Sequence, residues 1–256
     1  MRAGFFDVER SPVSTSLGPV ELPILYEDAS NVVALFGASL TGAAALLEGT
    51  GLEPAMVVGG QAIVGLSFYE YRATSIGAYN EVATAIFAKK VGDRPALRGL
   101  PDLWRDPRKR RVGTWVVDLP VTTELADVGG RELWGFPKFV TRIDFKLSGR
   151  DVECAVLAPS GEGWIERLAG TLGPSLRVPP VSLLTLTQLG GRLLRTPVDV
   201  RGATRAHLPG DVRLRVGDVR HRMADNLRTL GLDGAVPRLV HVTEHFQSVL
   251  HAGSSA

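Results

Sequence analysis

Residues 61–91, QAIVGLSFYEYRATSIGAYNEVATAIFAKKV, decide the fold class of this chain. The segments 61–72 and 78–91 both mix β-branched with aromatic residues, and apolar and polar positions alternate in part along each of them. This composition is typical of strands, and turn residues separate the two segments. We therefore predict two strands here and a β-rich fold around them.

Segments of the same character continue on both sides of this stretch. Their spacing and the turn signals between them predict a large antiparallel or mixed sheet that closes or folds over itself, because a barrel leaves few unpaired strand edges. The further predicted strands are 21–26, 31–36, 113–119, 139–147, 152–157, 164–168, 182–189, 196–205 and 212–216.

Short helices are predicted at three places. Ser39 is a plausible N-cap for a helix over 42–48, and a second helix opens at 122–124 and ends at Gly129-Gly130. A third is capped by Gly217-Asp218, and its apolar residues recur at helical spacing over 219–230. The predicted fold class is thus α+β and β-rich. We expect an N-terminal arm over 1–18 and a single domain over 19–252.

Composition excludes several classes of protein. Of the 256 residues, 45% are hydrophobic and 22% are charged, which is typical of a globular domain and excludes disorder, collagen and disulfide scaffolds. The net charge of +2 is too small to indicate electrostatic attraction to nucleic acid. There is no spanning apolar run, no signal-peptide pattern and only one cysteine, Cys154. We expect a cytoplasmic protein without a membrane or nucleic-acid partner.

The usual motifs of several enzyme classes are missing from the sequence. It contains no phosphate-binding glycine loop after a strand and no GxSxG segment. His241 and His245 are four residues apart and would share a helix face, but two ligands do not make a zinc site. The basic run at 105–111 is interpreted as a solvated loop. No metal site is predicted.

The segment RELWGFPKF, residues 131–139, surrounds a lysine with aromatic residues. Proline fixes the backbone before Lys138, and Trp134, Phe136 and Phe139 would exclude water from its amine. Burial penalises the ammonium form, and a neutral amine can attack a ketone or aldehyde to give an imine. The alternative is a surface lysine whose stem covers its aromatic neighbours.

The segment GAYNE, residues 77–81, places a carboxylate in an otherwise apolar strand. In a regular strand Glu81 would share a face with Tyr79 and Ala83. A buried carboxylate needs a partner, so Glu81 either transfers protons or makes a structural hydrogen bond.

GAYNE at 77–81 and RELWGFPK at 131–138 together resemble the acetoacetate decarboxylase superfamily, as does LRVGDVRHRMADNLRTLGL at 214–232. The resemblance implies a single domain built on a cone-like or closed barrel, no cofactor and a homo-oligomer. It implies that Lys138 forms an imine with the substrate and that Glu81 is the acid/base group. The pocket residues expected around them are Tyr79, Trp134, Phe136 and Phe139.

The sequence also departs from this family at three points. Phe139 stands where the decarboxylase has a second lysine, and Leu17–Leu25 lacks the arginine that meets the substrate carboxylate. Leu66 or Ser67 replaces a second pocket glutamate. These departures favour an imine-forming lyase that acts on a small keto acid or related carbonyl compound, with aldol addition and dehydration as its chemistry. The alternatives are a β-keto acid decarboxylase, an isomerase or cyclase that uses Glu81 alone, and a non-catalytic binding barrel.

Overall fold

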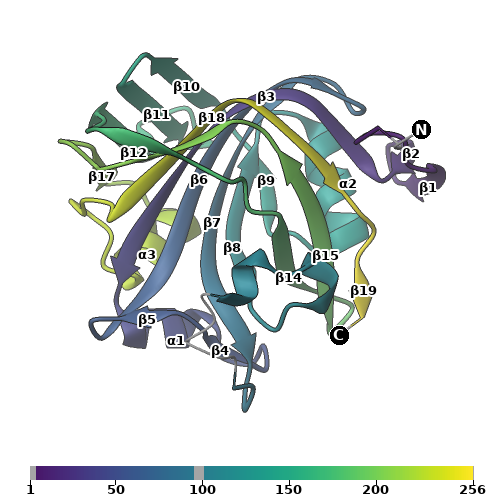
Figure 1. Ribbon diagram of the computed structural model, residues 1–256, viewed down its shortest axis with the longest axis horizontal. Helices are drawn as coiled ribbons and strands as arrows, with labels where there is room; N and C mark the ends of the chain where they lie inside the picture. Colours follow the sequence, from purple (N-terminus) through teal and green to yellow (C-terminus); the bar gives the residue numbers. More distant parts are fainter. Residues whose placement is uncertain (1–3, 95–100, 256) are drawn as a thin grey trace.

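The structure, a computed structural model, describes residues 4–94 and 101–255. Its centre is a closed barrel, whose ring is completed where β15 pairs with β18 (Figure 1). Neighbouring strands in the ring are antiparallel except β8 and β14, which run parallel. In ring order the strands are β18 (Leu239–Leu250), β3 (Ile24–Ala38), β6 (Gln61–Thr74), β7 (Tyr79–Lys90), β8 (Gly113–Val121), β14 (Leu183–Leu189) and β15 (Arg192–Arg201).

Strands β6 and β7 are buried on both faces. Tyr69 and Glu81 are cross-strand partners that face the inside of the barrel, whereas Phe68 and Val82 point outward and are fully buried. Because a second layer covers the outer face, polar residues are scarce on both sides. This is why apolar and polar positions alternate only in part between residues 61 and 91.

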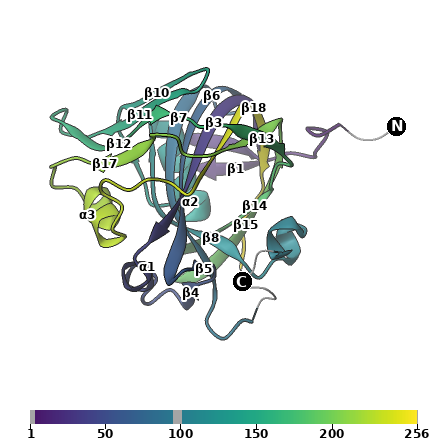
Figure 2. The ribbon, with the colours of Figure 1, turned by 60° about the vertical axis from the view of Figure 1, so that its left-hand side comes forward.

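The second layer is a smaller sheet with a helix (Figure 2). The sheet consists of β10 (Ile143–Ser148), β11 (Asp151–Leu157), β12 (Trp164–Thr171) and β17 (Arg213–Val216). Helix α3 (Arg222–Thr229) packs against β12 and β17. The main core lies between this layer and the barrel, and its largest side chains are Phe36, Phe68, Ile86, Ile165, Leu168, Leu214, Met223 and Leu227.

The other elements extend the barrel or close its ends. Additional strands are β4 (Leu52–Pro54), β5 (Val57–Val58), β9 (Lys138–Val140), β13 (Ser175–Val178), β16 (Thr204–His207) and β19 (Ser254–Ser255). Helix α1 (Leu40–Leu46) follows β3, and α2 (Glu124–Trp134) lies at the opposite end of the barrel (Figure 1). The two 3-10 turns are η2 (Pro101–Trp104) and η3 (Pro107–Lys109).

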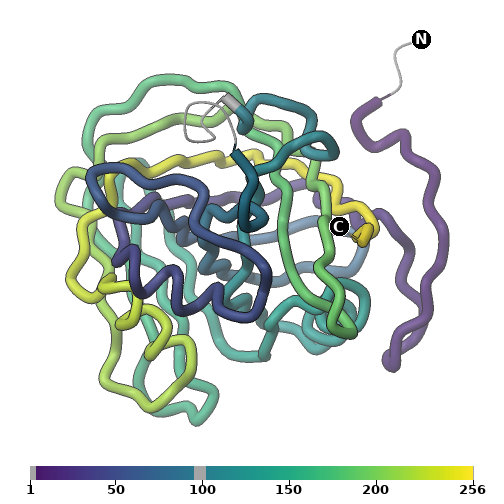
Figure 3. Tube along the Cα trace, turned by 90° about the horizontal axis from the view of Figure 1, so that it is seen from below, coloured from purple at the N-terminus to yellow at the C-terminus, as the bar shows by residue number. Residues whose placement is uncertain are grey.

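The N-terminal arm forms a hairpin beside the barrel. Strand β1 (Ser11–Thr15) pairs with β2 (Gly18–Leu22), and the trace of this region stands apart from the main body in Figure 3. Ser16 ties the hairpin to α2, since its backbone N–H and its hydroxyl donate to Glu132 at 2.9 and 2.6 Å. Strand β2 therefore includes residues on both sides of the boundary expected between the N-terminal arm (1–18) and the domain (19–252).

The β-rich class and the closed barrel are confirmed, but several predicted boundaries are wrong. The predicted strands 21–26 and 31–36 belong mostly to one long strand, β3, and 139–147 is divided between β9 and β10, which lie in different sheets. Strand β18 was not predicted, and the helix face proposed for His241 and His245 lies within it. Pairing of β18 with β3 shifts register near Thr243 and Phe246, so the alternation expected of a strand is broken there.

All three helices differ from their predicted bounds, α1 by two residues at each end. Ser39 caps α1 as predicted, because its hydroxyl accepts the N–H of Gly42 at 3.0 Å. Helix α2 runs through the expected stop at Gly129-Gly130 and ends at Trp134. Helix α3 begins later than predicted, with His221 as its N-cap, so Val219 precedes it.

A pair of carboxylates is buried between the barrel and the smaller sheet. Asp118 accepts a hydrogen bond from Asn226 at 2.8 Å and pairs with Arg222 at 3.0 Å. Glu166 is 0% exposed, and its oxygens have no hydrogen-bond partner among the described residues. Burial and the nearby charge of Asp118 raise the pKa of Glu166 well above its ordinary value, and burial raises the pKa of Asp118 to about 6. The structure therefore favours the protonated form of Glu166.

We expect Glu166→Gln to stabilise the fold as pH rises. Above the pKa of Glu166 in the unfolded chain, the folded protein retains a proton that the unfolded chain releases. The contribution of Glu166 to the free energy of unfolding is therefore complete below the unfolded pKa and is lost as pH rises through the raised folded pKa. Glutamine cannot lose this proton. Calorimetry should show a gain in Tm that grows between about pH 5 and pH 8, on the order of a few degrees. Glu153→Gln on the exposed face of β11 is the control and should show no such trend; a flat difference for Glu166→Gln would contradict this reading.

Candidate active site

The turn after α2 fixes the position of Lys138. Gly135 ends the helix with φ 65°, and a Cβ there would lie 2.0 Å from the carbonyl oxygen of Gln188, so only glycine fits. Trp134 anchors the turn, because its indole N–H donates to the carbonyl of His251 at 2.9 Å. Lys138 then pairs in parallel register with Leu119 of β8. The lysine is thus placed on a short strand that continues the barrel wall.

Lys138 and Glu81 form a buried ion pair. Lys138 Nζ lies 2.5 Å from Glu81 Oε2, and the two side chains are only 6% and 10% exposed. The predicted nucleophile and the predicted acid/base group, 57 residues apart in the chain, are therefore in direct contact. At this distance the amine donates a charge-assisted hydrogen bond to the carboxylate.

A cluster of tyrosines surrounds the ion pair. The Tyr71 hydroxyl donates to Glu81 Oε1 at 3.3 Å, and the hydroxyls of Tyr26 and Tyr79 lie 3.0 Å apart. Burial and the charge of Glu81 raise the pKa of Tyr71 and of Tyr79 well above the ordinary value. These hydroxyls accordingly stay protonated and can donate hydrogen bonds to Glu81 or to a substrate oxygen.

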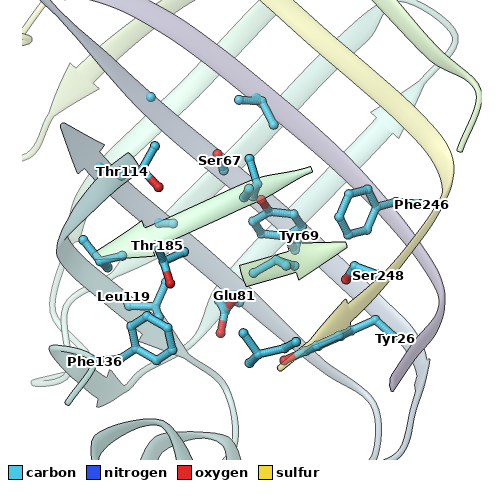
Figure 4. Close-up of a pocket in the computed structure, with 18 of the residues that line it drawn as sticks. Tyr26, Ser67, Tyr69, Glu81, Thr114, Leu119, Phe136, Thr185, Phe246 and Ser248 are labelled. Carbon is cyan, nitrogen blue, oxygen red and sulfur yellow. The ribbon is translucent and has the colours of Figure 1, made fainter. Parts of the chain in front are cut away.

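A cavity of about 140 Å³, here called the near chamber, opens beside the ion pair (Figure 4). Glu81, Phe136 and Tyr26 line its lower part in this view, and Thr114 and Ser67 line its upper part. Most of the other lining is aliphatic or aromatic, contributed by Val33, Leu35, Ala83, Ala85, Phe87, Val116, Leu119, Leu183, Val198, Phe246 and Leu250. The chamber is therefore an apolar space with a few hydroxyl groups beside one amine and one carboxylate.

The expected pocket residues lie at different depths. Phe136 lines the near chamber, and its ring centroid is 5.9 Å from Lys138 Nζ. The Tyr79 ring is 5.8 Å from the same nitrogen, and Trp134 packs behind Phe136, so these two form the layer outside the chamber. Phe139 points the other way, as adjacent residues of a strand do, and packs 4.7 Å from the ring of His221. The structure does not bring Phe139 to the chamber, which corrects that expectation.

The structure shows where the residues lie at which the sequence departs from the family pattern. Ser67 lines the near chamber, whereas Leu66 is fully buried in the core outside the barrel. Arg10 pairs with Glu21 on the N-terminal hairpin, and Arg131 pairs with Asp127 on α2. Among the described residues that line the near chamber, none is an arginine.

Sequence reasoning missed Tyr26, Tyr71 and Gly130. Tyr71 pairs with Tyr79 and Tyr69 with Glu81 across one hairpin, so the register of that hairpin was a usable signal. Gly130 lies against the lysine: a Cβ there would lie 2.4 Å from both Cδ and Cε of Lys138. This close approach, rather than the end of the helix, explains why residue 130 is a glycine.

Gly130→Ala should lower activity without unfolding the protein. The added methyl group must displace the stem of Lys138, and misplacement of a reacting group by about 1 Å can cost about 10²-fold in rate. Alanine is also favoured over glycine within a helix by about 1 kcal/mol, so the loss should occur in kcat/KM rather than in Tm.

Gly129→Ala is the matched control, because a Cβ at that position meets nothing within 4 Å. It should raise Tm slightly and leave the rate near wild type. Equal rates for the two variants would show that Gly130 does not position the lysine.

The residues that the structure describes contain no cluster of three or more His, Cys, Asp or Glu side chains that could hold a metal ion. None of their helices is both long and apolar enough to cross a membrane.

Comparison with known families assigns the chain. The sequence model of the acetoacetate decarboxylase family matches residues 10–213. This protein belongs to the acetoacetate decarboxylase family. No curated protein matches the chain. The family resemblance found in the sequence is therefore confirmed.

Solved structures of acetoacetate decarboxylase-like proteins share the fold. The acetoacetate decarboxylase of Legionella pneumophila superposes with a TM-score of 0.65 at 14% identity, covering 91% of this chain and 87% of its own. The enduracididine biosynthesis enzyme MppR, complexed with the condensation product of pyruvate and imidazole 4-carboxaldehyde, gives 0.65 at 16% identity, covering 96% and 97%. An acetoacetate decarboxylase-like enzyme from Sphingomonas wittichii RW1 gives 0.64 at 16% identity, covering 93% and 94%.

Proposed function

We propose that this protein is a lyase that forms an imine between Lys138 and a small keto acid or related carbonyl compound. The contact of 2.5 Å between Lys138 Nζ and Glu81 Oε2, at the wall of a largely apolar chamber, carries the proposal. It supplies a nucleophile and a proton acceptor for that nucleophile in apolar surroundings. No metal or organic cofactor is needed, because the iminium itself accepts electrons.

The proposed reaction begins with proton transfer from Lys138 to Glu81. The neutral amine attacks the carbonyl carbon, and protonated Glu81 gives its proton to the carbinolamine oxygen as water leaves. The carboxylate of Glu81 then takes a proton from the carbon next to the iminium, which produces an enamine. Each step uses the same amine and the same carboxylate.

We further propose that the enamine attacks an aldehyde and that the adduct loses water. Hydrolysis then releases the product and restores Lys138. Two observations support this choice over decarboxylation: the lack of an arginine among the described lining residues of the near chamber, and the fold shared with an enzyme that holds a condensation product of pyruvate. Decarboxylation of a β-keto acid is the alternative, supported by the family itself.

Borohydride trapping followed by product analysis tests this proposal. Incubation with pyruvate and sodium borohydride should add the mass of the reduced adduct at Lys138. With pyruvate and imidazole 4-carboxaldehyde, a condensed and dehydrated product should form, and acetoacetate should release little carbon dioxide. Brisk carbon dioxide release without any condensation would support the decarboxylase. A protein that binds carbonyl compounds but never traps them would be the non-catalytic binding barrel.

We also propose that the protein forms a homo-oligomer, as the family resemblance implies. Leu176 of β13 and nearby Leu208 are 64% and 57% exposed, and they offer apolar surface for a second copy of the chain. Light scattering at several protein concentrations tests the oligomeric state, and a constant monomer mass would contradict it.

A further inference from the structure

A second cavity of about 160 Å³, here called the far chamber, lies in the same barrel. Tyr69, Phe87 and Phe246 line both chambers, so the two spaces share a wall of aromatic side chains. The imine chemistry of Lys138 and Glu81 uses no residue that belongs to the far chamber alone. The barrel therefore encloses more space than a three-carbon or four-carbon keto acid fills.

Arg110 is a buried cation in the wall of the far chamber. It is 4% exposed, and it donates to the carbonyl oxygens of Arg105 at 2.9 Å and Ser182 at 2.5 Å. No carboxylate of the described residues forms an ion pair with it. Asp102, the first of two acids that act on it electrostatically, accepts the backbone N–H groups of Arg111 and Val112 instead. Residues 95–100 contain no acidic residue.

Such a cation is costly unless something neutralises it. Arginine stays protonated in proteins, and a buried charge without a counter-ion is strongly destabilising. The two carbonyl bonds use only part of a guanidinium group that has five N–H donors. Arg110 is thus able to receive an anionic group that enters the far chamber.

Other polar groups of the far chamber also lack partners. Asn31 is 5% exposed, and its Oδ1 accepts no hydrogen bond from the described part of the chain. The ring of His241, which lines the same space, makes no hydrogen bond to any described residue, and burial lowers the pKa of this ring. The unpaired Oδ1 of Asn31 is unfavourable in a cavity with a structural role alone, since unpaired buried polar atoms are destabilising.

We propose that the substrate is a long carbonyl compound with an anionic group at its far end. Its carbonyl carbon lies at Lys138, its apolar middle contacts Tyr69 and Phe246, and its anionic group binds Arg110. The carbonyl half of this inference rests on the proposed imine chemistry, whereas the anion site at Arg110 does not.

Strand geometry limits the distance between the two ends of the proposed binding site. Val112 lines the far chamber and Leu119, the register partner of Lys138, lines the near chamber. Seven residues of extended chain separate these two positions, which corresponds to roughly 23 Å. The side chains of Arg110 and Lys138 close part of this gap, and the substrate must span the rest.

Trapping with a series of methyl-ketone acids tests the inference on the wild-type protein. The probes are 4-oxopentanoate, 6-oxoheptanoate, 8-oxononanoate and 10-oxoundecanoate, each compared with its methyl ester in the presence of borohydride. A longer acid should half-saturate trapping at a concentration at least about tenfold below that of its ester, because a charge-assisted hydrogen bond contributes that much. The shortest acid should show no such preference. Equal values for acids and esters at every length would overturn the inference.

Arg110→Gln should abolish the preference for the acid while Lys138 is still modified. Arg108→Gln is the matched control, because Arg108 belongs to the same segment but is 47% exposed and pairs with Asp199 outside the chambers. The control should keep the preference. A preference that persists in Arg110→Gln would assign a structural role alone to this arginine.

Calorimetry with octanoate separates the anion site from the imine chemistry, since octanoate has no carbonyl group to trap. Wild type and Lys138→Met should bind octanoate, and 1-octanol should bind at least about tenfold more weakly. Octanoate binding without any trapped ketone would support the anion site and contradict the proposed function. Trapped ketones without octanoate binding would support the proposed function and contradict the anion site.

Discussion

Lys138→Met is expected to abolish imine trapping and to lower turnover by about 10⁴-fold or more, the scale seen when a catalytic nucleophile is removed. Methionine keeps the length and the apolar stem of the side chain but has no amine to attack a carbonyl carbon. The loss should occur in kcat, because the near chamber and its hydroxyl groups still bind the substrate. Intact-mass analysis after borohydride treatment and steady-state kinetics measure the two effects.

Two controls separate chemistry from folding. Lys89→Met removes another lysine ion pair, with Glu53, on the part of β7 far from Glu81, and it should be trapped like wild type. Lys138→Met also leaves Glu81 as a buried carboxylate without its cation, so the double variant with Glu81→Gln should recover stability but not activity. Turnover by a folded Lys138→Met protein would refute imine catalysis and favour a mechanism that uses Glu81 alone.

Glu81→Gln is expected to lower turnover by about 10²–10⁴-fold, the usual contribution of a general acid–base group, while borohydride still traps the substrate on Lys138. Without Glu81, solvent can accept the ammonium proton and protonate the carbinolamine oxygen, so the imine forms more slowly but still forms, whereas proton transfer at carbon lacks its carrier.

Glu70→Gln is the control for this variant. Glu70 lies on the adjacent strand β6 and pairs with exposed Arg72, so it should retain both trapping and turnover. If folded Glu81→Gln fails to trap the substrate even on prolonged incubation, then Glu81 is indispensable for imine formation, and the expectation that it is essential only for the later step at carbon is wrong. Single-turnover experiments distinguish these outcomes, because they separate adduct formation from later steps.

The two charged groups of the candidate site were predicted from the sequence, whereas the shape of their surroundings could not be. Local chemistry left the roles of Lys138 and Glu81 open, and the resemblance of the segments 77–81 and 131–138 to a known family singled them out. The error at Phe139 has the opposite origin: neighbours in sequence were expected to be neighbours in space, but alternation along β9 places Phe139 on the other face. Gly130 was interpreted as a stop signal because its true constraint, the stem of Lys138, is visible only after folding.

The strands were predictable to different degrees for a similar reason. Strands β6 and β7 have strongly β-forming composition, and they were found. Strand β18 contains the polar stretch His-Val-Thr-Glu-His, and its register shifts disturb the period of two by which a strand is recognised. Its position is determined by pairing with β3, about 200 residues earlier in the chain, and no local pattern carries that information.

The place of β18 in the ring has a consequence for how the protein is synthesised. This strand follows the other six barrel strands in the chain, yet it must insert between β3 and β15 to close the ring. A ribosome that adds residues in order therefore leaves one edge of β3 without its β18 partner until β18 has been made. Lys138 and Glu81 can meet earlier, through β7, β8 and β9. A nascent chain can thus bring Lys138 to Glu81 before the barrel around this pair has closed.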